Sequence, residues 1–319
     1  MTVPWTLVTG ASGFVGRPLV DRLFARGTPV VVLTRKANTS FGPGVRVHVG
    51  DLSTGEGVSP SLFTDVATVF HCAGEIKDES RMEAVHVDGT ARLLDAVAGR
   101  PSTMALRWVH VSSVGAYGPP RKATERRVID ETSPEAPVGT YEQTKTASDA
   151  LLRHASGHSG LTSTLLRPTA VIGAAMPNNS VRALIAMIRR GWFVYPGPAD
   201  AIANYVHVDD VVEALLVCGD HPRAAGETFI VSSDCPWTAL VSEVASALGV
   251  APPAWRLPHG LVSAGARVGG ALGAPLTVSR VNALAGRTAY SSAKIERMLG
   301  FRVSRPLPQA VLDVTGAAR

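Results

Sequence analysis

The strand–glycine–helix pattern at the start of the chain constrains the fold more than any other feature. Residues 3–9 (VPWTLVT) form a short apolar, β-branched run that predicts a buried strand. Gly10, Gly13 and Gly16 follow, and apolar residues then recur at helical spacing over 14–24. Glycines so placed permit a tight turn, close backbone approach to a pyrophosphate and close helix–strand packing, and the helix N-terminus offers free N–H groups to phosphates. Glycines can merely punctuate a loop, but the flanking strand and helix favour a dinucleotide-binding turn.

The end of the second predicted strand, 29–35 (PVVVLTR), bears on which dinucleotide binds. An acidic residue at this point bonds the free ribose 2′-hydroxyl of NAD, whereas a cation accommodates the 2′-phosphate of NADP. This chain has Thr34, Arg35 and Lys36 there and no acidic residue. Because two cations would pair with the extra phosphate, the sequence predicts a preference for NADP(H), with NAD(H) as the alternative. A solvated basic turn without a ligand is the other interpretation.

Strand-like and helical stretches alternate along the chain. The predicted strands lie near 3–9, 29–34, 45–49, 67–72, 106–112, 161–167 and 227–233, and the predicted helices near 14–26, 80–98, 139–156 and 206–218, the last opened by Asp209. Such alternation predicts an α/β fold with a doubly wound parallel (Rossmann) sheet.

Beyond residue 168 the pattern loosens, because Pro/Gly-rich loops separate the remaining elements. We expect a smaller, discontinuous C-terminal substrate lobe, with substrate bound between the lobes at the carboxyl ends of the strands. The predicted division is a dinucleotide-binding domain over 1–168, to which 204–233 returns, and a lobe made mainly of 169–203 and 234–319.

Tyr141, Lys145 and Ser113 form a candidate proton-transfer set. Tyr141 and Lys145 are four residues apart in YEQTK, so they share one face of a helix. An ammonium beside a phenol favours the phenolate, so we expect Lys145 to lower the pKa of Tyr141 from its ordinary value of about 10. Ser113 lies at the carboxyl end of the predicted strand 106–112, where open α/β sheets place their ligands, and its hydroxyl can hold a substrate carbonyl.

Together these motifs resemble those of extended short-chain dehydrogenase/reductases, in the NAD(P)-dependent epimerase/dehydratase family. The similarity extends over nearly the whole chain and includes TGASGFVG, GDL (50–52), HCAG (71–74), VHVDGT (85–90), VSSVGAYG (111–118), YEQTK, LRP (166–168) and YVHVDDVVEAL (205–215). The resemblance implies that Ser113, Tyr141 and Lys145 are catalytic. With the residues argued above, it implies a cofactor site made of Gly10, Ser12, Gly13, Phe14, Val15, Gly16, Thr34, Arg35, Lys36, Asp51, Leu52, Cys72, Ala73, Gly74, Tyr141, Lys145 and Pro168.

Three positions depart from the family's pattern. His86 stands where the family often has Asn, so the local hydrogen bonding can differ. Val114 and Gly115 stand where 4,6-dehydratases carry an Asp–Glu pair, so that elimination chemistry lacks its acid and base. Ala203 stands where UDP-galactose 4-epimerases carry an arginine for a nucleotide phosphate. Other arginines could supply that charge or be ordinary surface residues, namely Arg182, Arg280 and Arg287.

Composition limits the other classes of function. No apolar run approaches the roughly 18 residues of a membrane span, and the N-terminus lacks a signal-peptide pattern, so we expect a cytoplasmic protein without a membrane partner. The formal net charge is +5, but the cations are spread along the chain, so no nucleic-acid partner is predicted. The three cysteines lack metal-ligand spacing, and His154 and His158 lie where a helix ends at glycines, so no metal is predicted.

The resemblance also implies a homodimer built on the helices near 80–98 and 141–156. It implies an NAD(P)-dependent reductase or epimerase of a nucleotide-linked sugar, as in polysaccharide precursor synthesis. The alternative is an NADPH-dependent reductase of a free ketone or aldehyde, similar to dihydroflavonol reductases or hydroxysteroid dehydrogenases. Ala203 and the apolar residues Ile185, Met187, Trp192, Phe193 and Tyr195 favour this alternative. A redox-sensing binding protein with a dead site is a third interpretation, against which the intact Ser113, Tyr141 and Lys145 argue.

Overall fold

A seven-stranded, all-parallel sheet organises the computed structural model, which describes residues 3–37, 39–100, 104–122, 125–158, 160–177, 179–271 and 278–314. Its strands are β1 (Trp5–Thr9), β2 (Val30–Thr34), β3 (Arg46–Val49), β4 (Val66–His71), β5 (Leu106–Val111), β7 (Leu161–Pro168) and β11 (Thr228–Val231). Their spatial order is β11-β7-β5-β4-β1-β2-β3, so the winding reverses between β1 and β4. The predicted doubly wound α/β fold is confirmed.

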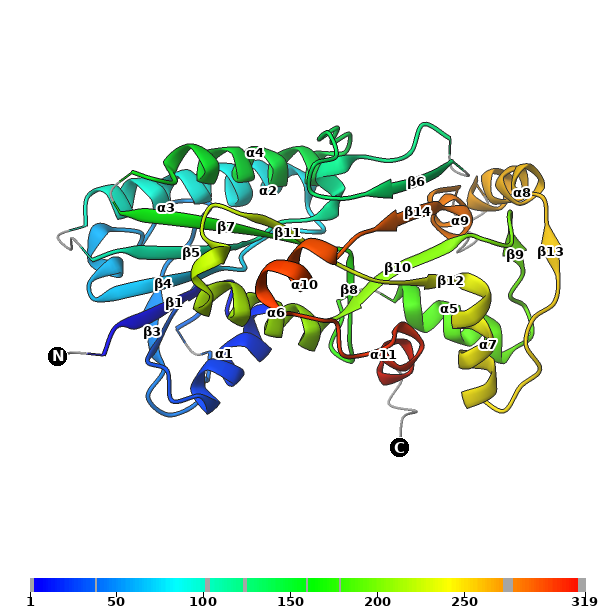
Figure 1. The fold of residues 1–319 in the computed structure, drawn as a ribbon, viewed down its shortest axis with the longest axis horizontal. Helices are drawn as coiled ribbons and strands as arrows, with labels where there is room; N and C mark the ends of the chain where they lie inside the picture. The colour runs from blue at the N-terminus through cyan, green and yellow to red at the C-terminus, as the bar shows by residue number, and fades with distance from the viewer. Residues whose placement is uncertain are drawn as a thin grey trace.

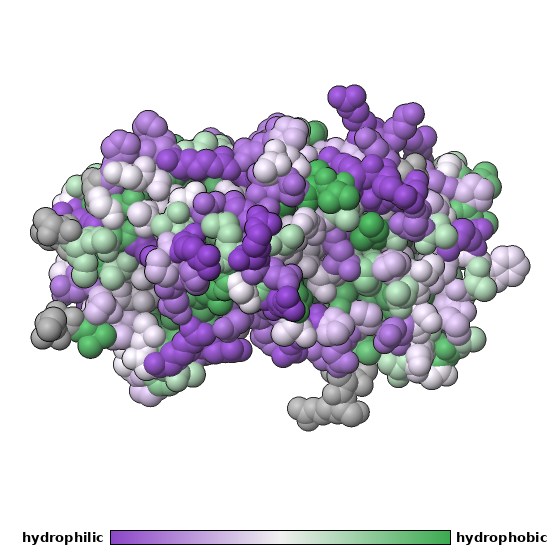
Figure 2. All heavy atoms as spheres, in the orientation of Figure 1, coloured by the Kyte–Doolittle hydropathy of each residue, from purple (hydrophilic) through white to green (hydrophobic). Residues whose placement is uncertain are grey.

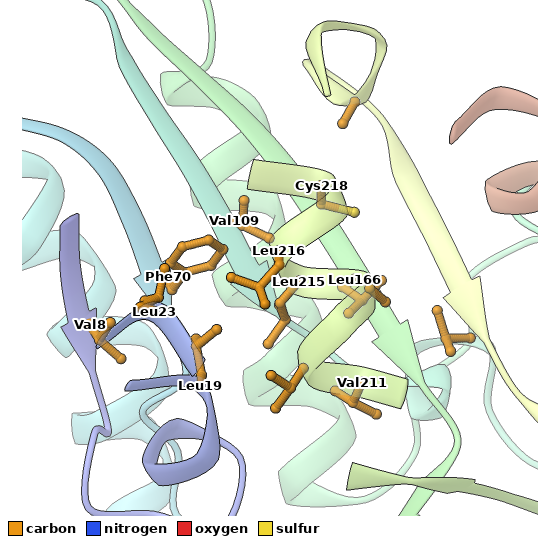
Figure 3. Packing of buried hydrophobic residues seen from close by; sticks show 14 of the residues in the cluster. Val8, Leu19, Leu23, Phe70, Val109, Leu166, Val211, Leu215, Leu216 and Cys218 are labelled. Carbon is orange, nitrogen blue, oxygen red and sulfur yellow. The ribbon is translucent and has the colours of Figure 1, made fainter. Parts of the chain in front are cut away.

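Helices cover both faces of this sheet (Figure 1). One face carries α1 (Gly16–Ala25) and α6 (Val208–Asp220), and the other carries α2 (Glu79–Glu83), α3 (Gly89–Ala98) and α4 (Thr140–Ala155). Figure 3 shows the first of these interfaces, where Leu19 and Leu23 of α1 and Leu215 of α6 pack with strand residues such as Val8. The neighbouring Leu7 points to the opposite face and packs with Leu93 and Trp108. Because both faces are buried, the central strands β1 and β2 are almost wholly apolar rather than alternating, whereas the edge strand β3 is mainly exposed.

Within the described residues, three small sheets and five helices form the other lobe, at the end of the molecule far from the N-terminus (Figure 1). The sheets pair β12 (Ser233–Pro236), β10 (Ile202–His207) and β8 (Ala170–Ile172); β13 (Arg256–Leu257) and β9 (Tyr195–Pro196); and β14 (Arg287–Tyr290) and β6 (Arg126–Ile129). The helices of this lobe are α5 (Ser180–Arg189), α7 (Trp237–Ala247), α8 (His259–Ala271), α9 (Val278–Ala285) and α11 (Leu307–Asp313), whereas α10 (Ala293–Leu299) packs with α1 and α6 in the core of the large sheet. Short turns of 3₁₀ helix lie at Pro60–Phe63, Val114–Tyr117 and Pro222–Ala224.

Two predicted helices differ from the structure. The helix expected over 206–218 with Asp209 at its start begins instead at Val208, after β10 has run through His207. The imidazole of His207 is the cap, since its Nδ1 accepts the Asp209 N–H at 3.2 Å. The single helix expected over 80–98 is α2 and α3 joined by a π-helical turn, Ala84–Asp88. Such turns contain one extra residue and often occur at functional sites.

The apolar residues expected to line the substrate lobe have another role. Ile185, Phe193 and Tyr195 are buried in a second hydrophobic core, where they pack against α7 and α11. Met187 is half-buried beside this core, whereas Trp192 is exposed. These side chains therefore stabilise the lobe and give no support to an apolar substrate.

Candidate active site

A cavity of about 1250 Å³ lies at the carboxyl ends of the sheet strands, against the smaller lobe. It brings together predicted residues from five parts of the chain: Ser12, Gly13, Phe14 and Val15; Cys72, Ala73 and Gly74; Ser113; Tyr141 and Lys145; and Pro168. The other predicted cofactor residues are outside this lining. Gly10 and Gly16 support the glycine turn. Thr34 ends β2 and is followed by Arg35 and Lys36, and Asp51 and Leu52 follow β3.

The glycine turn is shaped by contacts that a side chain would prevent. Gly10 has φ +64°, and a Cβ there would lie 2.6 Å from the Ala73 backbone nitrogen. A Cβ on Gly16 would lie 2.1 Å from the Gly10 carbonyl oxygen, and one on Gly13 would lie 3.0 Å from the same atom. The turn therefore brings the start of α1 and the end of β4 into backbone contact, leaving a side-chain-free surface where a pyrophosphate can approach.

The end of β2 carries exposed positive charge. Thr34 is buried, whereas Arg35 and Lys36 are exposed. Burial raises the pKa of Asp51, but hydrogen bonds from Ser53 and the charges of Arg35 and Arg81 give a net lowering. Arg35 thus lies close enough to the predicted adenine-contact residue to act on its charge. A 2′-phosphate arriving here would find a cation as its partner.

Ser113 and Tyr141 meet at the centre of the cavity. Ser113 begins the turn after β5, where its Oγ accepts the Gly115 N–H at 3.0 Å. Burial, followed by the charges of Glu142 and Asp149, raises the pKa of Tyr141 to about 12, while a hydrogen bond with Ser113 lowers it. The expectation that Lys145 lowers this pKa is wrong for the protein without a bound cofactor, because the Lys145 ammonium is engaged elsewhere.

Lys145 points into a buried polar network behind the cavity. Its Nζ lies 3.2 Å from Nε2 of His110, and both side chains are buried. Burial lowers the pKa of Lys145 to about 8, against the opposing charge of Asp149. Asp149 accepts hydrogen bonds from Ser112 Oγ at 2.7 Å and from Arg167 Nη2 at 2.7 Å, and its Oδ1 is 3.7 Å from His110 Nε2. The negative charge of Asp149 therefore favours the charged form of Lys145, and His110 Nε2 lies near both groups.

His86 joins the cavity wall to the helix that bears Tyr141. Its Nε2 accepts the Glu75 backbone N–H at 2.8 Å, which leaves the proton on Nδ1 to be donated to Thr144 Oγ1, also at 2.8 Å. The ring lies edge-on to the Tyr141 ring, with centroids 5.6 Å apart. Burial and the charge of Lys145 lower the pKa of His86 to about 3. His86 is thus a neutral positioning residue and no proton carrier near neutral pH.

Sequence reasoning missed His110, Ser112, Asp149 and Arg167. Two patterns could have found the first three. Asp149 continues the four-residue spacing of Tyr141 and Lys145 along α4, and His110 and Ser112 are two residues apart on one face of a strand. Arg167 had no local signal, since its pairing with Asp149 depends on the approach of β7 to α4.

A smaller cavity of about 470 Å³ lies in the other lobe and shares Ala170 with the large one. Asn204, Tyr205 and Trp237 line it, and the rings of Tyr205 and Trp237 are perpendicular, 6.0 Å apart. The Trp237 indole N–H is buried and lacks a hydrogen-bond partner in the described structure. An unpaired buried donor at a cavity wall is a candidate ligand contact. Across the described residues, no group of three or more His, Cys, Asp or Glu side chains is placed to hold a metal ion.

The structure combines a parallel Rossmann sheet with Ser113 just after the strand β5 and with Tyr141 and Lys145 on the helix α4, as in extended short-chain dehydrogenase/reductases. The chain belongs to the NAD-dependent epimerase/dehydratase family, whose model matches residues 6–232. An NAD(P) cofactor is typical of this family.

Individual relatives differ in what they act on. The chain is 34% identical to a dTDP-6-deoxy-L-talose 4-dehydrogenase (NAD(P)(+)) of Kitasatospora kifunensis, over 68% of this chain and 72% of that protein. It is 26% identical to the 3β-hydroxysteroid-dehydrogenase/decarboxylase isoform 1 of Arabidopsis thaliana, over 97% of this chain and 78% of that protein. The structure of MoeE5 in complex with UDP-glucuronic acid and NAD has a TM-score of 0.74 and 23% identity over 98% of each chain, a likeness that shows the fold.

Proposed function

We propose that this protein is an NADP(H)-dependent oxidoreductase or epimerase that acts on the secondary alcohol or ketone of a nucleotide-linked hexose. One observation carries the proposal: Ser113, Tyr141 and Lys145 line the same cavity as the glycine turn. A proton-transfer set and a dinucleotide-binding surface are the two parts that hydride chemistry at a carbonyl requires.

The residues present fit a dinucleotide. Gly13 lines the cavity without a side chain, and the cavity continues from it to Tyr141, while Gly10 and Gly16 permit the close backbone contacts that shape this turn. The nicotinamide, when bound, would give or take the hydride. Ser113 would hold the substrate oxygen, and Tyr141 would transfer the proton to or from that oxygen. Lys145 would supply positive charge beside the phenol and contact the nicotinamide ribose. We propose NADP(H) as the preferred form, because exposed Arg35 and Lys36 follow β2 and no acidic residue does.

The smaller cavity supports a nucleotide-linked substrate. Two aromatic rings, the Asn204 side chain and the Trp237 N–H, which has no hydrogen-bond partner in the described structure, are groups that can bind a nucleobase. Ala170 borders both cavities, so one ligand can occupy the two together. Val114 and Gly115 offer no acid or base beside Ser113, which disfavours a 4,6-dehydratase.

A free ketone is the second candidate, and a specific observation favours it. Ala203 is completely buried in β10, and two of the three arginines that could supply its missing charge are engaged elsewhere. Arg287 is ion-paired with Asp200, and Arg182 donates to the Ala174 carbonyl at 2.6 Å. The side chain of Arg280 lies outside the described residues.

Thermal shift with NADPH, UDP, dTDP, their hexose conjugates and a free cyclic ketone separates these candidates, since a specific ligand raises the melting temperature by mass action. We expect UDP or dTDP and its hexose conjugates to raise the melting temperature of the wild type. Most of this rise should be lost in Trp237→Phe, which keeps an aromatic ring and removes the N–H. Trp108→Phe is the matched control, because the Trp108 N–H is also buried and unpartnered but lies in the sheet core. Stabilisation by the ketone alone, with its turnover, would replace the nucleotide-sugar proposal by the second candidate.

The homodimer is also a proposal. Leu93 and Val97 of α3 are buried on the sheet, whereas Val85, Val87 and Leu94 are only half-buried and leave apolar surface for a partner helix. Sedimentation velocity at micromolar concentration should give a dimer, and a monomer would refute it.

A further inference from the structure

The far end of the smaller lobe exposes large apolar side chains. Trp192 and Trp255 are 70% and 75% exposed, and Leu257 and Leu261 are 41% and 66% exposed. We call these four residues the tryptophan edge. Single exposed apolar residues are ordinary on a protein surface, but a group with two tryptophans indicates an interaction site.

The fold gathers the tryptophan edge from three segments. β9 and β13 pair with Tyr195 opposite Arg256, and the Tyr195 N–H donates to the Trp255 carbonyl at 3.0 Å. Arg256 packs over the ring of Tyr195, which belongs to the lobe core. Because side chains alternate along a strand, Trp255 and Leu257 point away from that ring.

Trp192 precedes β9 in the chain and Leu261 follows β13, so both lie close to this pair of strands in sequence. Trp192 follows α5, where Gly191 has φ +69° and the Trp192 N–H donates to the Met187 carbonyl. Leu261 lies in the first turn of α8. β9, β13 and α8 lie together at the end of the long axis in Figure 1, and Figure 2 shows green and pale residues gathered there among purple ones.

The sequence around the tryptophan edge is strongly basic. The two segments 171–199 and 244–280 carry six arginines and no acidic residue, so their charge of +6 exceeds the formal net charge of +5 of the whole chain. Four of these arginines are exposed, namely Arg189, Arg190, Arg256 and Arg267. Arg190 lies over the Trp192 ring at 5.4 Å. The nearest acidic residues in sequence are Glu243 and Asp200, and Asp200 is already ion-paired with Arg126 and Arg287.

We propose that the tryptophan edge docks on an anionic lipid surface. Tryptophan prefers the interface between headgroups and acyl chains, and arginines beside it are attracted to anionic headgroups. A second copy of the chain fits less well, because facing copies of this surface would bring like charges together. No helix among the described residues is long and apolar enough to cross a membrane, so the contact is peripheral. The proposal revises the expectation of no membrane partner and is independent of the substrate.

Co-sedimentation with vesicles tests the proposal. Vesicles of phosphatidylcholine alone are compared with an equal mixture of phosphatidylcholine and phosphatidylglycerol, at low and high salt. We expect binding to the mixed vesicles at low salt, release at high salt, and a blue shift of tryptophan emission on binding. Replacing Arg189 and Arg190 together by Gln should weaken binding by about thirtyfold, since each cation near the surface contributes about fivefold. Trp192→Ser with Trp255→Ser should weaken it by at least about tenfold and abolish the blue shift.

The matched control is Val3→Ser with Val128→Ser, which removes two side chains that are 64% and 71% exposed outside the tryptophan edge. This control should bind vesicles as the wild type does, and all variants should keep the wild-type circular dichroism and NADPH affinity. Binding to neither vesicle, equal binding to both, or wild-type binding by the tryptophan variant overturns the proposal. If the wild type does not bind vesicles but self-associates, and the tryptophan variant does not self-associate, the surface binds a second copy of the chain and the lipid proposal is wrong.

Discussion

The buried ammonium of Lys145 should lower the stability of the protein at neutral pH, and Lys145→Met should reveal the cost. Burial lowers the Lys145 pKa from 10.5 to about 8. Each pKa unit corresponds to about 1.4 kcal/mol, so keeping the charged form in the fold costs about 3 kcal/mol below that pKa. Between the two values the unfolded chain binds more protons than the folded one, so stability rises with pH through this window. The variant has no such group and should lack this rise.

Urea denaturation of both proteins at about pH 7 and about pH 9.5 measures the effect. The wild type should gain about 2 kcal/mol of unfolding free energy relative to Lys145→Met between the two conditions. The lost contact to His110 also affects the variant, but it contributes nearly equally at both pH values and cancels. The lowered pKa values of His71, His86 and His110 lie below the window. Parallel curves for the two proteins would show that Lys145 has an ordinary pKa and would refute the account of a desolvated ammonium.

Three further substitutions test the site. Tyr141→Phe should reduce turnover by about 10²–10⁴-fold and change NADPH affinity by less than about threefold; steady-state kinetics retaining more than about a third of the wild-type rate would assign the proton to another group. Arg35→Asp should reverse the cofactor preference by about ten- to a hundredfold in titration calorimetry, and equal or tighter NADH binding by the wild type would contradict the charge argument. His86→Ala should speed amide exchange in 74–78, whereas His86→Asn, with its own donor and acceptor, should restore part of the protection; unchanged exchange in both would show that His86 does not hold this segment.

Sequence patterns predicted those parts of the candidate site whose positions are set by residues close by in the chain. The glycine turn follows from the backbone contacts of Gly10 and Gly16, and the common face of Tyr141 and Lys145 follows from helix geometry. Ser113 was located by its place at the end of a strand. In each case the residues that fix the position of the group lie within a few residues of it, or on a neighbouring strand of the parallel sheet. The buried strands were found for the same reason, because buried parallel strands form apolar runs, whereas the edge strand β3 is mainly exposed.

Contacts between distant segments account for what the sequence did not show. The pairing of Asp149 with Arg167 joins α4 to β7, and the contact of Lys145 with His110 joins α4 to β5. His207 caps α6 in place of Asp209 because the strand β10, which was not among the predicted strands, runs through His207. Ile185 and Phe193 were assigned to substrate because nothing in their own segment reveals the second core that buries them.

The raised pKa of Tyr141 favours reduction of a ketone over oxidation of an alcohol. A pKa of about 12 keeps Tyr141 as a neutral phenol at neutral pH, which is the form that donates a proton to a ketone being reduced. Oxidation of an alcohol needs the phenolate, and burial among the charges of Glu142 and Asp149 opposes it. We therefore expect reduction to proceed at neutral pH, and alcohol oxidation by NADP⁺ to be slow there and to accelerate as pH rises toward the Tyr141 pKa. Initial rates in both directions from about pH 6 to about pH 10 measure this asymmetry. An oxidation rate independent of pH over that range would show that binding of cofactor and substrate lowers the phenol pKa well below its value in the free protein, and that Lys145 then acts on Tyr141 after all.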